Sequence, residues 1–309
     1  KNYLSFFFRY YKKKRRLKIA DLSLGNLIIF AAFLKNQKSF NNSLKDVHDF
    51  LNIKKNKVLN VTDGKNFYLY AILENGVIID NEEDLVTVKQ KFPIENIFLL
   101  KNKISSKNLN ILSKYKKKDK INFFNRSKKY PKINPEVRFN LYKADIIIYG
   151  PGTQYSSLFP SYLTRDLKKT IESSRAKKFL VTNIFLDNDI INENVEDIIN
   201  KFYFFFNKKT KSQSKKRLVD YYLINKYDED DLNLLKKENY LIFDKKKNFT
   251  LLDWEKSEGL HYPNSLAKKI LSLSNKKSII KSLPKSVLSI IVPCLNEKKT
   301  IGKVLKKIQ

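Results

Sequence analysis

Short apolar runs alternate with amphipathic stretches along much of this 309-residue chain. The runs at 146–148 and 179–184 are rich in β-branched or aromatic residues and end at glycine or polar residues, which is typical of buried parallel strands. Between them, Leu163, Leu167 and Ile171 recur at four-residue spacing and predict a helix with one apolar face. Strand, turn, helix and strand in this order predict a βαβ unit with a right-handed crossover, and therefore an α/β fold with a mostly parallel sheet.

The same patterns predict the other elements. Apolar runs at 67–73 and 77–80 flank Asn75-Gly76, a strong signal for a two-residue hairpin. Residues 101–135 are rich in Lys, Asn and Ser, and predict a poorly packed connection with local helix. The remaining predicted elements are a helix at 27–34, an amphipathic helix at 195–206, a basic loop at 207–217, a strand at 221–225 and a helix at 266–273.

The segment that follows the strand at 146–148 carries the clearest chemical signal. Gly150 and Gly152 bracket Pro151, so the chain turns sharply and has no side chain to keep a ligand away from its backbone. Hydroxyls and amides follow where a helix should begin, and a helix start with free N–H groups suits a phosphate. The candidate phosphate-binding residues are Gly150, Pro151, Gly152, Thr153, Tyr155, Ser156 and Ser157. A strand-to-helix turn with no ligand is the alternative.

Two further segments are candidates for the same site. Asn183 ends the next strand, and ligands of parallel sheets bind beyond the carboxyl ends of the strands, so we expect its amide beside the glycine loop. Asp21 or Ser23 is expected to cap the helix that follows, where Gly25 and Asn26 would present amides to an anion. A plain capped core helix is the alternative for this second segment.

Composition changes the picture only slightly. The apolar content of 42% supports a real core. The net charge of +31 would ordinarily suggest nucleic acid or an anionic membrane. We attribute it instead to a compositional bias, because the excess is mostly lysine spread along the whole chain. The run at 12–16, beside Tyr10 and Tyr11, is the one local basic-aromatic patch, and we interpret it as a solvated or substrate-steering segment.

The rarest residue types exclude several classes of protein. Cys294 is the single cysteine, which rules out an internal disulfide framework and favours a reducing, cytoplasmic location. His48 and His261 are far apart in sequence and offer no metal-ligand spacing, so no metal site is predicted. The longest apolar stretch, 24–34, is too short to span a bilayer. The chain begins at Lys1 and contains no methionine, so we expect its natural N-terminus to lie upstream.

Several of these segments together resemble a known family. They are Asp21–Asn26, the block from Ala144 to Ser157, Thr182-Asn183, and His261-Tyr262-Pro263 with Leu266-Ala267. They are similar to the CofD/YvcK-like family, which includes 2-phospho-L-lactate transferase and the gluconeogenesis factor. The resemblance covers roughly residues 5–273 and implies a Rossmann-like three-layer α/β sandwich. It also implies a nucleotide-linked ligand, because one branch transfers a phospholactyl group from a guanosine diphosphate carrier and another binds nucleotide sugars.

The resemblance also sets limits. The family opens with a glycine-rich strand-to-helix loop and an aspartate-glycine segment, neither of which occurs here. Any Mg²⁺ would therefore be held by acids outside this chain, no catalytic base can be named, and the chain alone is expected to be inactive. We assign residues 1–283 to the CofD/YvcK-like domain, and a homo-oligomer is compatible with this assignment.

The sequence changes character beyond Pro284. An apolar strand pattern at 287–292 precedes a turn with Pro293, Asn296 and Glu297, and an amphipathic helix pattern follows. This order resembles the start of a family 2 glycosyltransferase, in which the turn lines a sugar-nucleotide pocket. We therefore expect residues 284–309 to be a linker and the beginning of a second α/β domain, of the glycosyltransferase A type. The alternative is a last strand and helix of the preceding domain.

Three hypotheses for function follow. The first is a transferase that binds a nucleotide-linked phospho-ligand and is fused to a glycosyltransferase that uses a nucleotide sugar. The second is a non-catalytic nucleotide-sugar-binding regulator of the gluconeogenesis-factor type. The third is a basic nucleic-acid-binding protein, which the dispersed charge does not favour. In the first two, the ligand is a nucleoside diphosphate or a nucleotide sugar, with no specific nucleic acid and no transmembrane segment.

Overall fold

A computed structural model describes most of the chain. The described residues are 5, 9, 24–53, 58–81, 84–85, 92–208, 218–227, 232–237, 240–243, 249–253, 255–257, 259–274 and 288–291. The chain divides into two compact units, one formed by residues 1–66, 132–137 and 296–309, and the other by residues 67–131 and 138–295.

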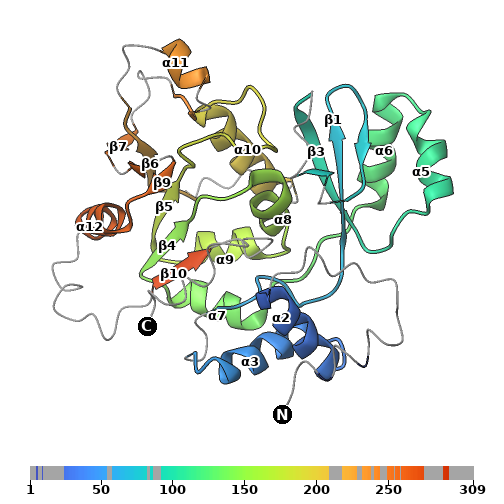
Figure 1. The fold of residues 1–309 in the computed structure, drawn as a ribbon, viewed down its shortest axis with the longest axis horizontal. Helices are drawn as coiled ribbons and strands as arrows, with labels where there is room; N and C mark the ends of the chain where they lie inside the picture. The colour runs from blue at the N-terminus through green and yellow to red at the C-terminus, as the bar shows by residue number, and fades with distance from the viewer. Residues whose placement is uncertain are drawn as a thin grey trace. The chain divides into compact units, whose positions relative to one another are not determined.

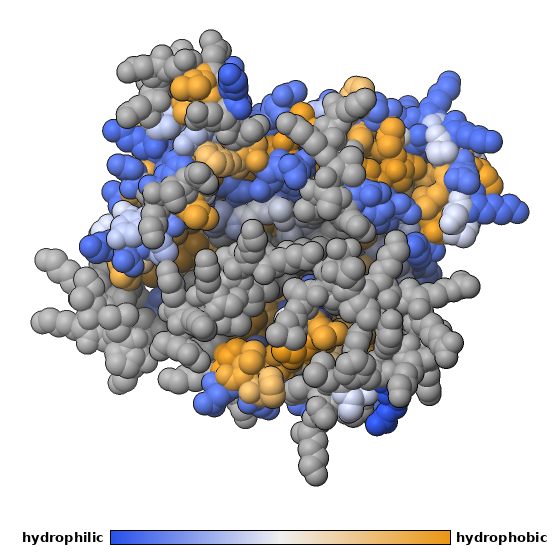
Figure 2. Space-filling model, viewed as in Figure 1, coloured by the Kyte–Doolittle hydropathy of each residue, from blue (hydrophilic) through white to orange (hydrophobic). Residues whose placement is uncertain are grey.

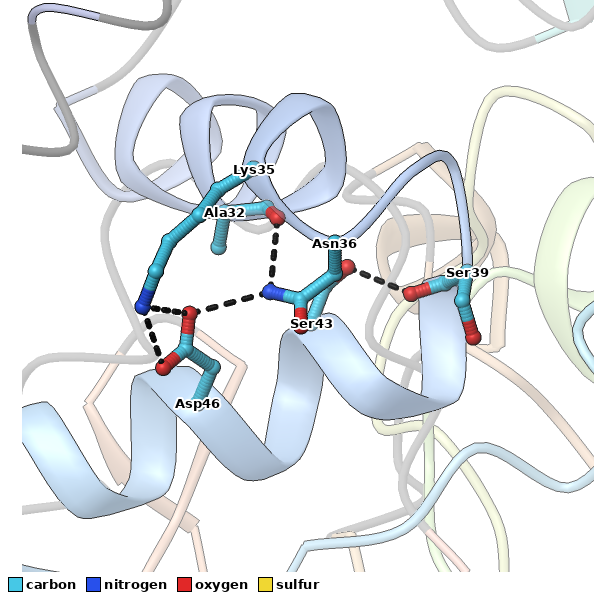
Figure 3. Close-up of polar contacts among 6 residues, drawn as sticks. All are labelled: Ala32, Lys35, Asn36, Ser39, Ser43 and Asp46. Carbon is cyan, nitrogen blue, oxygen red and sulfur yellow. Dashed lines mark hydrogen bonds and ion pairs between the residues drawn. The ribbon is translucent and has the colours of Figure 1, made fainter.

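The first unit contains a pair of helices, α2 (Leu24–Lys35) and α3 (Phe40–Phe50). Asp46 of α3 fastens the pair, since its carboxylate accepts hydrogen bonds from Lys35 Nζ at 2.8 Å and from Asn36 Nδ2 at 2.9 Å (Figure 3). The Asn36 amide also bonds to the carbonyl of Ala32 (Figure 3). The Asn36 carbonyl accepts the Ser39 N–H at the turn. One carboxylate therefore stabilises the end of α2 and its turn into α3.

Replacing Asp46 with alanine should lower the free energy of unfolding by about 1 kcal/mol, because a partly exposed, charge-assisted pair of hydrogen bonds is lost. Urea unfolding followed by circular dichroism measures this change. Asp49→Ala removes the same charge from an exposed position on the same helix and should have almost no effect. Equal losses in the two variants would show that the Asp46 contacts contribute nothing specific.

The second unit begins with a small antiparallel sheet in the order β2-β1-β3. The hairpin predicted at Asn75-Gly76 is confirmed, and Gly76 has the positive φ of 82° that its turn requires. Two helices pack on this sheet through Leu112 and Phe124, which join a core with Tyr70 and Phe98. The bounds of these elements are β1 Tyr68–Leu73, β2 Ile78–Ile79, β3 Ile94–Leu100, α5 Ser106–Ser113 and α6 Lys117–Ser127 (Figure 1). The prediction of a poorly packed connection at 101–135 is therefore wrong, although its local helix is confirmed.

A five-stranded parallel sheet in the order β10-β4-β5-β6-β7 forms the rest of this unit, so the predicted α/β class is confirmed. The strands are β4 Ile146–Tyr149, β5 Lys177–Val181, β6 Tyr221–Asn225, β7 Thr250–Leu252 and β10 Leu288–Ile291. The helices and short strands around them are α7 Pro135–Lys143, η1 Gln154–Leu158, α8 Phe159–Tyr162, α9 Leu167–Ser173, α10 Val195–Asn207, α11 Leu232–Lys237, β8 Glu255–Ser257, β9 Leu260–His261 and α12 Pro263–Leu273. Among described residues, no helix is long and apolar enough to cross a bilayer.

Helices cover both faces of the parallel sheet, which gives the predicted three layers. Phe179 and Leu223 pack with Ile270 of α12 on one face. Ile224, the next residue along β6, packs with Ile198 of α10 on the other face. Successive side chains of a strand point to opposite faces, so the two cores lie on the two sides of the sheet.

The helix predicted across Leu163, Leu167 and Ile171 is interrupted. The chain first forms the π-helical turn η1 and the four-residue α8, and it resumes as α9 only after Asp166, whose φ is +65°. All three leucine and isoleucine side chains are nevertheless buried, as their spacing predicted. Periodicity therefore identified the buried face correctly but not the break in the backbone.

Residues 288–291 form β10, which pairs in parallel with β4 at the edge of the sheet. The segment 287–292 was expected to begin a separate domain, and in the structure its strand instead joins the sheet of the second unit as an edge strand. The predicted sugar-nucleotide residues Pro293, Asn296 and Glu297 lie outside the described residues. The assignment of 284–309 to a second domain stays a prediction.

Candidate functional site

The loop between β4 and η1 meets the end of β5 at the carboxyl edge of the parallel sheet. The Gly152 N–H donates to Asn183 Oδ1 at 2.9 Å, and Asn183 Nδ2 donates back to the Gly152 carbonyl at 3.2 Å. This reciprocal pair holds the loop to the neighbouring strand end. The predicted juxtaposition of Asn183 and the glycine loop is therefore confirmed, because the carboxyl ends of adjacent parallel strands lie on one edge.

The buried carboxylate of Asp189 accepts hydrogen bonds from the backbone at the start of η1. Its Oδ2 accepts the Tyr155 N–H at 2.8 Å and the Ser156 N–H at 3.3 Å, and only 3% of the residue is exposed. Its Oδ1 is buried and has no hydrogen-bond partner among the described residues. Burial raises the pKa of this carboxyl from 3.8 to about 6, although the backbone N–H groups act in the opposite direction. A carboxylate therefore uses amides that the sequence suggested for a phosphate.

A second buried acid supports the loop from the same side. The Tyr155 hydroxyl donates to Glu193 Oε1 at 3.0 Å, and Lys201 of α10 pairs with the same oxygen while lying 5.1 Å from the Tyr155 ring centre. Burial raises the pKa of Glu193, and Lys201 opposes that shift. Desolvation also raises the pKa of the Tyr155 hydroxyl, so this side chain stays protonated and acts as a donor.

The predicted hydroxyl groups divide into two sets. Tyr155, Ser156 and Ser157 are buried and support the loop from within, so the structure does not place them to contact a ligand. Thr153 is half-buried and donates its hydroxyl to Ser157 Oγ at 2.8 Å. Its backbone N–H has no acceptor among the described residues. The partly exposed rim of the site therefore consists of Pro151, Gly152, Thr153 and Asn183.

Two residues that were not predicted as site residues also reach this edge. Asp187 accepts a hydrogen bond from Asn183 Nδ2 at 2.5 Å and is partly exposed. His261 places Nε2 3.0 Å from the carbonyl of Thr182, the residue before Asn183. Burial lowers the pKa of His261, so its ring is largely neutral near pH 7. The sequence carried one signal for Asp187 and Asp189, which is a pair of acids shortly after a strand end.

The other predicted segment lies in the first unit. Gly25 and Asn26 are in the first turn of α2. The predicted caps Asp21 and Ser23 lie outside the described residues. The expectation that Asn26 shares a cleft with the glycine loop stays a prediction.

The described residues at this edge of the sheet form no metal-binding cluster. The described residues contain no group of three or more His, Cys, Asp or Glu side chains that could hold an ion. Asp187 is a partly exposed acid beside the rim, and its carboxylate already bonds to Asn183. We therefore derive no chemical step through Mg²⁺ from these residues.

Comparisons with known proteins agree on the family. The family model described as "2-phospho-L-lactate transferase CofD" matches residues 2–262. A gluconeogenesis factor of Thermoanaerobacterium thermosulfurigenes is 34% identical over 166 residues, which are 52% of this chain and 42% of that protein. One of Clostridium acetobutylicum is 28% identical over 220 residues, or 70% of this chain and 40% of that protein. The chain thus spans less than half the length of these curated relatives.

A solved structure supports the fold. The crystal structure of protein BH3568 from Bacillus halodurans superimposes with a TM-score of 0.57 at 20% identity, covering 81% of this chain and 72% of that one. At this identity the likeness concerns the fold alone. The match to the family model ends at residue 262, before the segment 284–309.

Proposed function

Because the chain belongs to the 2-phospho-L-lactate transferase CofD family, we propose that the rim of the β4–η1 loop binds the phosphate-bearing part of a nucleotide-linked ligand for a transfer reaction. The observation that carries the proposal is the reciprocal hydrogen bond between Gly152 and Asn183. It fixes a glycine loop at the carboxyl edge of a parallel sheet, where such folds bind their ligands. Rigid support of this kind lets a loop hold an anion without being ordered by it.

The inner face of the β4–η1 loop is held by protein contacts, and its exposed rim is left for the ligand. On the inner face, Asp189 satisfies the Tyr155 and Ser156 amides and fixes the start of η1. On the rim, the Thr153 N–H has no acceptor among the described residues and is the amide left for a ligand oxygen, and Gly152 provides no side chain to block the approach. A phosphate would therefore bind at the Thr153 N–H rather than at the amides that follow it, and Asn183, whose Nδ2 already donates to the Gly152 carbonyl and to Asp187, positions the loop.

The chemistry of transfer is a separate matter from binding. The rim residues offer hydrogen-bond donors and acceptors, and none of them has a side chain that can act as a general base. A binding role as a regulator is favoured by one observation, which is that the curated relatives described above are gluconeogenesis factors. In either role this rim binds the ligand, and turnover of a phospho-donor by the full-length protein distinguishes the two. A glycosyltransferase beginning at 284–309 stays a separate hypothesis.

A matched pair of substitutions at Thr153 tests the proposal. Thr153 has φ −60°, which proline also adopts, so Thr153→Pro removes the rim N–H at a compatible backbone angle. Thr153→Val keeps that N–H and removes only the hydroxyl. Titration calorimetry with uridine and guanosine diphosphates should show affinity for the valine variant within a few-fold of wild type. Loss of one hydrogen bond to a charged phosphate should weaken the proline variant by about 10- to 100-fold.

Thermal unfolding of both variants controls for damage to the loop. If both bind as tightly as the unmodified chain, the Thr153 amide is not a ligand contact and the proposed site is wrong. If both lose binding equally, the hydroxyl rather than the amide is the important group.

A further inference from the structure

The α5–α6 segment concentrates positive charge far beyond the chain average. Residues 101–129 contain eleven Lys or Arg residues and one acidic residue, Asp119. More than a third of this segment is therefore basic, against a fifth of the whole chain. A uniform compositional bias does not explain this difference, so the earlier interpretation of the charge does not hold for this segment.

Most of these cations are exposed and form no ion pair among the described residues. Lys117 pairs with Glu95 at 2.7 Å, and the buried Lys120 donates to the Gly76 carbonyl at 2.8 Å. The exposed cations with no acidic partner among the described residues are Lys101, Lys103, Lys107, Lys114, Lys116, Lys118, Arg126 and Lys129. Their mutual repulsion is not relieved within this unit, which favours an anionic partner.

Large apolar side chains are exposed among these lysines. Ile111 is 47% exposed and Tyr115 is 53% exposed. Lys107 and Ile111 lie four residues apart on α5 and therefore on one face of that helix, and Lys114, its C-cap residue, and Tyr115 follow directly at its end. Phe123 of α6 is also exposed, and Figure 2 shows apolar surface bordered by hydrophilic side chains in the region where Figure 1 has α5 and α6.

We propose that the α5–α6 face, defined by Lys107, Ile111, Lys114, Tyr115 and Lys118, docks on an anionic lipid bilayer. Exposed apolar side chains flanked by lysines match the chemistry of a bilayer interface, where apolar groups enter the acyl boundary and cations meet lipid phosphates. Nucleic acid fits less well, because an aliphatic side chain such as Ile111 cannot stack on bases. The segment also contains a single arginine, the residue that most often reads base edges.

Vesicle co-sedimentation of the full chain tests the proposal. The protein should bind vesicles of phosphatidylcholine mixed with phosphatidylglycerol, should not bind phosphatidylcholine alone, and should dissociate at high salt. Lys107→Glu/Lys114→Glu/Lys118→Glu should weaken partitioning by about 100-fold, since each of the three lysines near the surface contributes about fivefold. Ile111→Ser/Tyr115→Ser, which keeps the charge, should weaken it by about tenfold.

A control variant distinguishes binding through the α5–α6 face from a general effect of the chain's net charge. Lys236→Glu/Lys237→Glu/Lys268→Glu makes the same change of charge at exposed positions on α11 and α12, and it should bind vesicles almost as the unmodified chain does. Equal losses in the two triple variants would reduce the effect to net charge and overturn the proposed surface. Binding to single-stranded RNA with no binding to vesicles would overturn the bilayer in favour of nucleic acid.

Discussion

Replacing Gly152 with valine should weaken nucleoside diphosphate binding by at least about 100-fold. Gly152 stands between Pro151 and Thr153 on the partly exposed rim, and both of its backbone polar groups bond to Asn183. A branched side chain at this position would stand where a phosphate must approach the backbone, so the loss is steric and affects the ligand more than the core. Titration calorimetry with uridine and guanosine diphosphates measures the change.

Gly152→Ala serves as a graded control, because its single methyl group should reduce affinity less than the valine side chain does. Both variants should unfold near the temperature of the unmodified chain. Unchanged affinity in Gly152→Val would remove the loop from the binding site.

Replacing Asp189 with alanine should lower the free energy of unfolding by about 3 kcal/mol. The substitution leaves the buried Tyr155 and Ser156 N–H groups without their acceptor, and each such group costs about 1 to 3 kcal/mol. Asp189→Asn keeps a side-chain oxygen of the same reach and removes the buried charge, so it should be far less destabilising at neutral pH. Urea unfolding of the two variants measures this difference. Equal destabilisation would show that the charge, rather than the acceptor, holds η1.

The same pair of proteins should show a specific dependence on pH. The pKa of Asp189 is raised in the folded state from 3.8 to about 6, so the folded state binds this proton more tightly than the unfolded state does. The unmodified chain should therefore lose stability relative to Asp189→Asn as the pH rises from about 3 to about 7, by about 3 kcal/mol in total. Above about pH 7 the difference should be constant. A difference that does not change across this range would mean that Asp189 has an ordinary pKa.

The parts of the site that the sequence predicts are those that follow from strand order. Gly152 and Asn183 each follow a buried apolar run, and adjacent parallel strands bring their carboxyl ends to one edge. The contact between them therefore needed only two strand assignments. Asp189 could not be found in this way, because its contact with the Tyr155 amide depends on how the chain folds back after β5 rather than on any periodicity.

Two other differences have local physical causes. The helix predicted across Leu163 and Leu167 is broken by Asp166 in a left-handed conformation, and apolar spacing does not report a single backbone angle. The segment at 101–135 was predicted to be poorly packed because polar residues dominate it. Single buried anchors, Leu112 and Phe124, are nevertheless sufficient to dock α5 and α6 on their sheet. Average polarity is a poor guide where a helix packs through only one or two buried side chains.

Selective labelling with ¹⁵N-glycine tests the central claim, ligand binding at the β4–η1 loop, most directly. The chain contains seven glycines, so its amide spectrum is simple enough to follow during titration with a nucleoside diphosphate. The resonances of Gly150 and Gly152 should shift, while those of Gly64, Gly76 and Gly259 should stay in place. A saturating ligand that moves the other glycines and leaves Gly150 and Gly152 unchanged would contradict the assignment of the site.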